Sequence, residues 1–236
     1  MLLFAAALAG AAAGFLAYRH HASIALGLEP LAGLPAAPAT RSTPAAAPAA
    51  ATEPAAAPAP AAPVIPATVP DISLPDLAGK KQALRSADGH PRLYNFWATW
   101  CEPCRREIPL LNTLQDAYAG EGLQIVGVAV DFRDEVQKYL RTTRLHYTSL
   151  VGEEDGLDAA QKFGMDLVLP FSVFADEQQR IVAVKVGELH RDEAEAILAQ
   201  MRLLRARRTS LAEAQASIAA TMKQLALDRA KQSPPK

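Results

Sequence analysis

The chain contains only two cysteines, Cys101 and Cys104, and two residues separate them. Disulfide exchange needs one thiolate that attacks a disulfide and a second thiol that resolves the mixed disulfide. Two intervening residues at the start of a helix place both sulfurs within bonding reach, and the helix N-terminus stabilises the first thiolate. We therefore predict Cys101 as the nucleophile and Cys104 as the resolving thiol.

The residues around this pair predict the strand and helix that the chemistry requires. Residues 92–97 are typical of a strand, and residues 102–118 carry apolar side chains at helical spacing. Pro103 falls in the first turn of that helix, where its missing N–H would have no partner. The cysteine pair therefore opens a helix directly after a strand.

A metal site is the alternative use of the same two cysteines. Cys-x-x-Cys spacing is also half of a zinc site, but the other two ligands are not evident, since His90, His146 and His190 stand singly. Copper(I) bound by both thiolates is the second hypothesis, and the chain would then be a copper carrier. No nearby cluster of methionine or histidine supports it, and we expect no cofactor.

The rest of the region predicts an α/β fold. The early order alternates strands and helices, which predicts parallel pairing, and two late strands in succession predict an antiparallel hairpin. We expect strands at 123–130, 147–151, 171–175 and 180–186, and helices at 134–141, 157–163 and 191–207.

The motif around the cysteines resembles the signature of the TlpA/ResA-like thioredoxin family. Residues 96–109 read FWATWCEPCRREIP, and the resemblance extends more loosely from Ile72 to Met201. It implies a thioredoxin fold, with a central mixed sheet flanked by helices, an N-terminal hairpin and an inserted β/α element. It also implies a thiol–disulfide oxidoreductase that reduces disulfides in exported proteins, for cytochrome c maturation or copper-site assembly.

The resemblance assigns further residues to the substrate surface. Pro170 matches the family's cis-proline facing the cysteines, which would expose the backbone of Leu169 for pairing with an extended substrate. Trp100 would flank the nucleophile, although a core tryptophan is an alternative. We place Trp100, Pro103, Leu169 and Pro170 in the substrate-binding set.

Glu107 is the third catalytic candidate. It lies three residues past Cys104, so both side chains share one helix face. In the related reductases this glutamate serves near the active site, while Asn95 stands where ordinary thioredoxins have a buried aspartate. A partly buried Glu107 could move a proton for Cys104. The alternative is a solvated glutamate on the helix surface.

Two positions depart from the family pattern. Phe171 stands where the family has threonine after the cis-proline, and Gln178-Gln179 stands where a glycine is usual between two strands. We expect the first change to alter the substrate face and the second to affect only turn geometry.

Four segments divide the chain. Residues 1–21 are apolar up to Tyr18 and predict a signal anchor or signal peptide. Residues 22–70 form an Ala/Pro-rich linker, and 71–207 form the thioredoxin-like domain. Residues 208–236 are a C-terminal helical tail, which opens on a capping box.

The family topology implies an N-terminal anchor in the cell inner membrane and a catalytic domain that faces the periplasm. Protein disulfides would be the substrates, and a membrane-bound thiol would donate electrons. Arg19, which follows the apolar run, points to the opposite orientation by the positive-inside rule. The balance of 24 basic and 25 acidic residues gives no indication of a nucleic-acid partner.

Overall fold

The structure is a computed structural model that describes residues 64–85, 88–166 and 168–232. The expected anchor and most of the linker lie outside these residues. In the described part of the chain, no helix combines the length and apolar character needed to cross a membrane.

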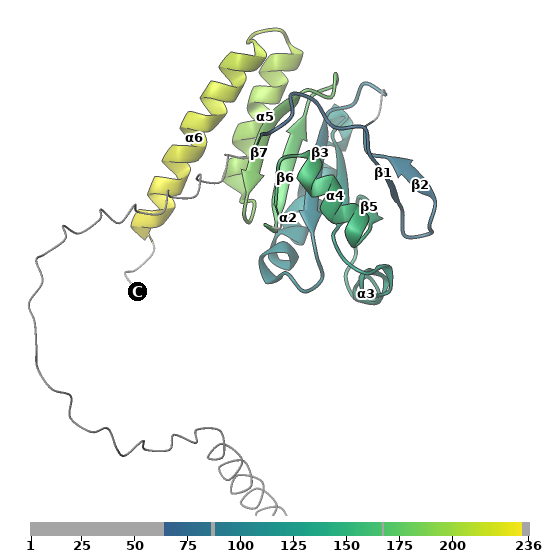
Figure 1. The fold of residues 1–236 in the computed structure, drawn as a ribbon. Helices are drawn as coiled ribbons and strands as arrows, with labels where there is room; N and C mark the ends of the chain where they lie inside the picture. Colours follow the sequence, from purple (N-terminus) through teal and green to yellow (C-terminus); the bar gives the residue numbers. More distant parts are fainter. Residues whose placement is uncertain (1–63, 86–87, 167, 233–236) are drawn as a thin grey trace, which may run out of the picture. The chain divides into compact units, whose positions relative to one another are not determined.

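A five-stranded mixed sheet with strand order β5-β4-β3-β6-β7 forms the centre of the fold (Figure 1). The central strand β3 pairs in parallel with β4, as the sequence predicts, and antiparallel with β6. The predicted antiparallel hairpin forms between β6 and β7. A separate antiparallel hairpin, β1 with β2, precedes it. The strands are β1 (Ser73–Pro75), β2 (Lys81–Ala83), β3 (Arg92–Trp97), β4 (Gln124–Ala129), β5 (Thr148–Val151), β6 (Phe171–Ala175) and β7 (Ile181–Val186).

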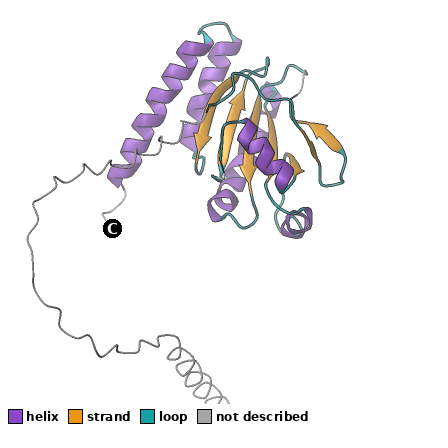
Figure 2. Ribbon diagram, in the orientation of Figure 1, coloured by secondary structure: helices purple, strands orange, loops and turns teal. Residues whose placement is uncertain are grey.

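Helices flank the sheet on both faces (Figure 2). The predicted helices all form, and the one in the inserted β/α element begins three residues earlier than expected. They are α2 (Glu102–Tyr118), α3 (Arg133–Tyr139), α4 (Glu154–Lys162), α5 (Arg191–Arg205) and α6 (Leu211–Gln232), with a short 3₁₀ helix at Ala119–Glu121.

Alternation along β3 divides the core between the two faces of the sheet. Leu93 packs in the cluster formed with α2 and α5, whereas Tyr94 and Phe96 pack on the other face. Phe171 is fully buried there, and its ring stacks on Phe96 with centroids 4.2 Å apart. The expectation that Phe171 alters the substrate face is therefore wrong, because its side chain points into the core.

The turn between β6 and β7 accommodates a glutamine in place of glycine. Gln179 has a φ of 61°, in the left-handed region that glycine adopts most easily. Its side-chain oxygen accepts a hydrogen bond from Tyr94 Oη at 2.8 Å, and its carbonyl accepts one from the Val69 N–H. These contacts offset the backbone strain. They also fix residue 69, which the sequence assigns to the linker, in the core at 0% exposure.

The strand directions bring the candidate active-site residues to one edge of the sheet. β3 and β4 are parallel, and β7 is antiparallel to β6, so the carboxyl ends of β3, β4 and β7 meet the amino end of β6. Cys101, Asp131 and Glu188 follow the first three strands, and Pro170 precedes the fourth. We call this edge the active-site edge.

The C-terminal helix α6 packs beside α5 (Figure 1). Ala214 and Ile218 are buried against the domain, and Gln215 Nε2 donates to the carbonyl of Ile181 on β7. Near the other end of α6, Arg229 bonds the carboxylates of Asp192 and Glu193 at the start of α5. The tail helix is therefore part of the domain.

Removing the apolar contact of α6 is expected to destabilise the fold. Ile218 is 5% exposed. The Ile218→Ala variant should lose about 2 kcal/mol of unfolding free energy, near the low end for a large-to-small core change, because the helix is peripheral. Urea unfolding measures this loss. Leu227→Ala on the same helix, at a side chain 49% exposed, should change stability by less than about 0.5 kcal/mol. An equal effect of both variants would contradict the packing.

Candidate active site

Cys101 and Cys104 are joined by a disulfide at the N-terminus of α2. Cys101 is the N-cap residue, and its Sγ accepts a hydrogen bond from the Cys104 N–H at 3.3 Å. Pro103 lies in the first turn, as predicted. Cys101 is 6% exposed and Cys104 is fully buried. An incoming disulfide can therefore reach Cys101 first, while the helix N-terminus stabilises a thiolate there.

Two substrate-surface residues lie beside the pair. Trp100 is 62% exposed, so the alternative of a core tryptophan is wrong. The Leu169–Pro170 peptide bond is cis, which confirms the expected isomer. The half-buried Leu169 packs against the cluster that contains both cysteines. Its backbone makes no hydrogen bond with another described residue, so it is open to an extended partner.

Glu107 lies in a buried hydrogen-bond network on the same helix. It is 2% exposed, so the alternative of a solvated surface glutamate is wrong. Its Oε1 accepts from Asn95 Nδ2 at 2.7 Å, and its Oε2 accepts from the Leu189 N–H at 2.7 Å. Asn95 Nδ2 also donates to Ser172 Oγ at 3.1 Å. The carboxylate thus links α2, β3, β6 and the segment between β7 and α5.

The surroundings of Glu107 favour a carboxyl that titrates near neutrality. The pKa of Glu107 is raised to about 7, chiefly by burial, and the nearby Glu188 carboxylate adds a smaller contribution in the same direction. The Leu189 and Asn95 donors and the Lys185 ammonium act in the opposite direction. A group with a pKa near the working pH is suited to accept and return a proton. The helix spacing places it on the face of Cys104.

Asp131 organises the loop before the nucleophile, and sequence reasoning missed it. It is 5% exposed, and its Oδ2 accepts from the Thr99 N–H at 2.8 Å and from Thr99 Oγ1 at 2.6 Å. Its Oδ1 accepts from the Phe132 N–H at 2.8 Å. One carboxylate therefore fixes the loop that carries Trp100 and Cys101 to the end of β4. A polar residue directly after a buried strand was the available signal.

Loss of the Asp131 carboxylate is expected to destabilise this loop. The Asp131→Ala variant leaves the part-buried Thr99 N–H and hydroxyl without their acceptor, and an unsatisfied donor costs about 1–3 kcal/mol, toward the lower value when water can reach it. Urea unfolding should show a loss in that range. Thr99→Val, which removes only the hydroxyl bond, should lose less. If Thr99→Val loses as much as Asp131→Ala, the backbone hydrogen bond contributes nothing.

The thioredoxin fold and the paired cysteines at its active-site edge define a thiol–disulfide oxidoreductase, which confirms the predicted class. Residues 66–200 match the Redoxin family, and the chain belongs to that family. Among the described residues, no group of three or more His, Cys, Asp or Glu side chains could hold a metal ion.

Named relatives support the same class. The chain is 35% identical over 130 residues to the thioredoxin-like protein YneN of Bacillus subtilis, covering 53% of this chain and 74% of YneN. It is 29% identical over 130 residues to the thiol-disulfide oxidoreductase ResA of Bacillus thuringiensis subsp. konkukian, covering 55% and 73%. A Chlorobium tepidum protein assigned as thiol:disulfide interchange protein DsbE has a similar structure, with a TM-score of 0.51, 28% identity and coverage of 58% and 94%. These relatives do not favour the copper-carrier alternative.

Proposed function

We propose that this protein reduces disulfides in exported proteins. The observation that carries the proposal is the Cys101–Cys104 disulfide at the N-terminus of α2, with the buried Glu107 carboxyl on the same helix. In the reduced protein, the Cys101 thiolate attacks the substrate disulfide and releases one substrate thiolate. Cys104 then attacks Cys101 Sγ, forms the intramolecular disulfide and releases the second. Two electrons pass from the dithiol to the substrate, and Glu107 accepts the proton of Cys104.

Exposed apolar side chains around the cysteines support a protein substrate. Trp100, Phe132, Val168 and Val186 are 62%, 58%, 47% and 47% exposed. Each lies next to a strand end at the active-site edge. Large apolar side chains gathered at one place on a surface mark a site of protein contact. An extended segment that bears the disulfide would bury them while it pairs with Leu169.

The cellular setting is the second part of the proposal. ResA relatives and the resemblance to membrane-anchored reductases support residues 1–21 as an anchor in the inner membrane, with the domain in the periplasm. The linker would begin at residue 22 and end before Ala67 and Val69, which bond the turn and strand at the start of β7. The domain would continue to residue 207, with 208–236 as its helical tail. An exported dithiol becomes oxidised with each turnover, so a membrane-bound thiol donor must re-reduce it. Cytochrome c maturation or copper-site assembly are the processes that supply such substrates.

Reduction of insulin tests the proposed direction. The pre-reduced full-length chain should cleave the insulin disulfides, and precipitation of the freed B chain reports the rate. Cys101→Ser should give only the background rate. The oxidised chain should be slow to form disulfides in a reduced, unfolded protein. Faster disulfide formation than disulfide cleavage would make the protein an oxidase instead.

A further inference from the structure

Arg106 joins the active-site motif to the segment that follows β7. Its Nη1 donates to Glu102 Oε1 at 3.0 Å, and Glu102 lies between the two cysteines. Its Nη2 and Nε both donate to Glu188 Oε2, at 2.7 and 3.0 Å. The Glu188 side chain is 24% exposed, against 73% for Glu102. Because exposed ion pairs contribute little, the contact with Glu188 is the stronger of the two.

This contact and the buried Glu107 line the same groove. A groove of about 350 Å³ runs between α2 and the start of α5, and its lining includes Arg106, Glu107, Glu188, Leu189 and His190. Glu188 precedes Leu189, whose N–H donates to Glu107 Oε2. The Arg106 guanidinium therefore bonds Glu188, the residue directly before Leu189, whose N–H donates to Glu107.

We propose that Arg106 is a positioning residue that locks the Gly187–His190 segment onto α2 through Glu188 and so keeps the Leu189 N–H directed at the Glu107 carboxylate. Any effect of this positioning on disulfide reduction rests on the proposed function, in which Glu107 accepts the proton of Cys104. The positioning itself concerns only the folded, oxidised protein. It can be measured without any substrate.

The charges that face Glu107 decide the direction of the expected change. Lys185 and Glu188 act on it from β7 and the segment after it, and His190 and Arg191 line the same groove from the start of α5. Tyr147, before β5, interacts with Glu107 electrostatically, while Asn95 and Ser172 from β3 and β6 are neutral members of its network. Without Arg106, Glu188 keeps an unneutralised charge, and the Leu189 N–H is held only by the buried Leu189 side chain and the neighbouring backbone hydrogen bonds. Both changes favour the protonated form of Glu107.

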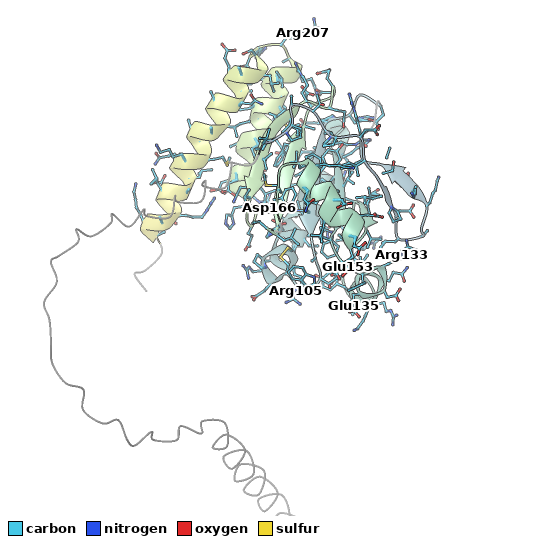
Figure 3. All side chains as sticks on the ribbon, viewed as in Figure 1. Arg105, Arg133, Glu135, Glu153, Asp166 and Arg207 are labelled. Atoms are coloured by element: carbon cyan, nitrogen blue, oxygen red, sulfur yellow. A yellow bond between two sulfur atoms is a disulfide. The ribbon has the colours of Figure 1, made fainter. Side chains whose placement is uncertain are left out.

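The test is a carbon-13 NMR titration of the glutamate carboxyls in the oxidised full-length chain, with Glu107→Gln to assign the resonance. The Arg106→Gln variant should raise the titration midpoint of Glu107 by about half a unit to one unit. Arg106→Lys keeps the charge and should restore at least half of the shift. Arg105→Gln is the matched control, because Arg105 is exposed (Figure 3) and its side chain bonds no other described residue.

Equal midpoints for Arg106→Gln and the unsubstituted chain would overturn the proposal. It would also be overturned by an equal shift in Arg105→Gln, which would indicate a general effect of net charge. These outcomes are independent of the proposed function, because the titration involves no disulfide substrate. If the chain fails to reduce insulin but Arg106→Gln still shifts the Glu107 midpoint, the reductase proposal is rejected. The positioning role of Arg106 then stands.

Discussion

Replacing Cys104 with serine is expected to stop the reaction after its first step and to leave the substrate bonded to Cys101. Cys104, the proposed resolving thiol, is fully buried and disulfide-bonded to Cys101, and the chain has no third cysteine to take its place. A serine hydroxyl cannot attack the mixed disulfide. Multiple turnover should therefore fall to background, a loss on the order of 10³-fold or more, as for other residues that act as a unit.

Mass spectrometry under non-reducing conditions identifies the trapped species. The Cys104→Ser chain should carry one substrate chain through Cys101, and added dithiothreitol should release it. The double variant Cys101→Ser/Cys104→Ser is the control and should trap nothing. Trapping by Cys101→Ser and not by Cys104→Ser would reverse the two assigned roles.

Replacing Glu107 with glutamine is expected to have the second largest effect on turnover. In the proposed mechanism ionised Glu107 accepts the Cys104 proton, so the rate should rise with pH through the Glu107 pKa of about 7. Glutamine cannot accept that proton, and loss of general base catalysis should lower kcat by about 10²-fold. A kcat profile from pH 5 to 9 measures both features. A variant that keeps the rise near pH 7 would assign it to another group.

The same change should stabilise the protein at alkaline pH. The folded-state pKa of Glu107 is raised from 4.5 to about 7, so stability is fully present below pH 4.5 and is lost as pH rises through 7. A difference of that size corresponds to about 3 kcal/mol. Glu107→Gln, whose amide can still accept from Leu189 and can donate to Asn95 Oδ1, escapes that loss.

Urea unfolding at pH 4 and pH 8 tests this stability change. The variant and the unsubstituted chain should be similar at pH 4, and the variant should be more stable by up to about 3 kcal/mol at pH 8. The Asn95 amide must rotate to offer its oxygen to the glutamine. A constant difference between the two proteins at both pH values would show that the buried carboxyl does not set the pH dependence.

Local patterns in the sequence predict most of the fold. The apolar spacing of residues 102–118 matches the 17-residue helix α2, and the near-continuous apolar run at 123–130 contains β4. Hydrophobic periodicity depends only on near neighbours, so it can be read from the chain itself. The cysteine pair is likewise recognisable from its local context, whereas the expected cis-proline rests on the resemblance to the TlpA/ResA-like family.

The contacts that position the site depend on residues far apart in sequence. Asp131 lies 32 positions from Thr99, and Arg106 lies 82 positions from Glu188. Neither pair has a local pattern, because the strand order of the sheet brings its members together. The same reason explains the error at Phe171, since the register of β6 against β3 turns its side chain onto Phe96.

The reduction potential of the Cys101–Cys104 pair in the full-length chain decides whether the protein donates or accepts electrons. Equilibration with glutathione or dithiothreitol buffers, read by thiol alkylation, gives the value. The proposed reductase predicts a potential near that of thioredoxin, roughly −270 mV, at which the dithiol can donate electrons to exported disulfides. A potential of roughly −120 mV, that of a strong periplasmic oxidant, would rule out the reductase and make the protein a disulfide donor.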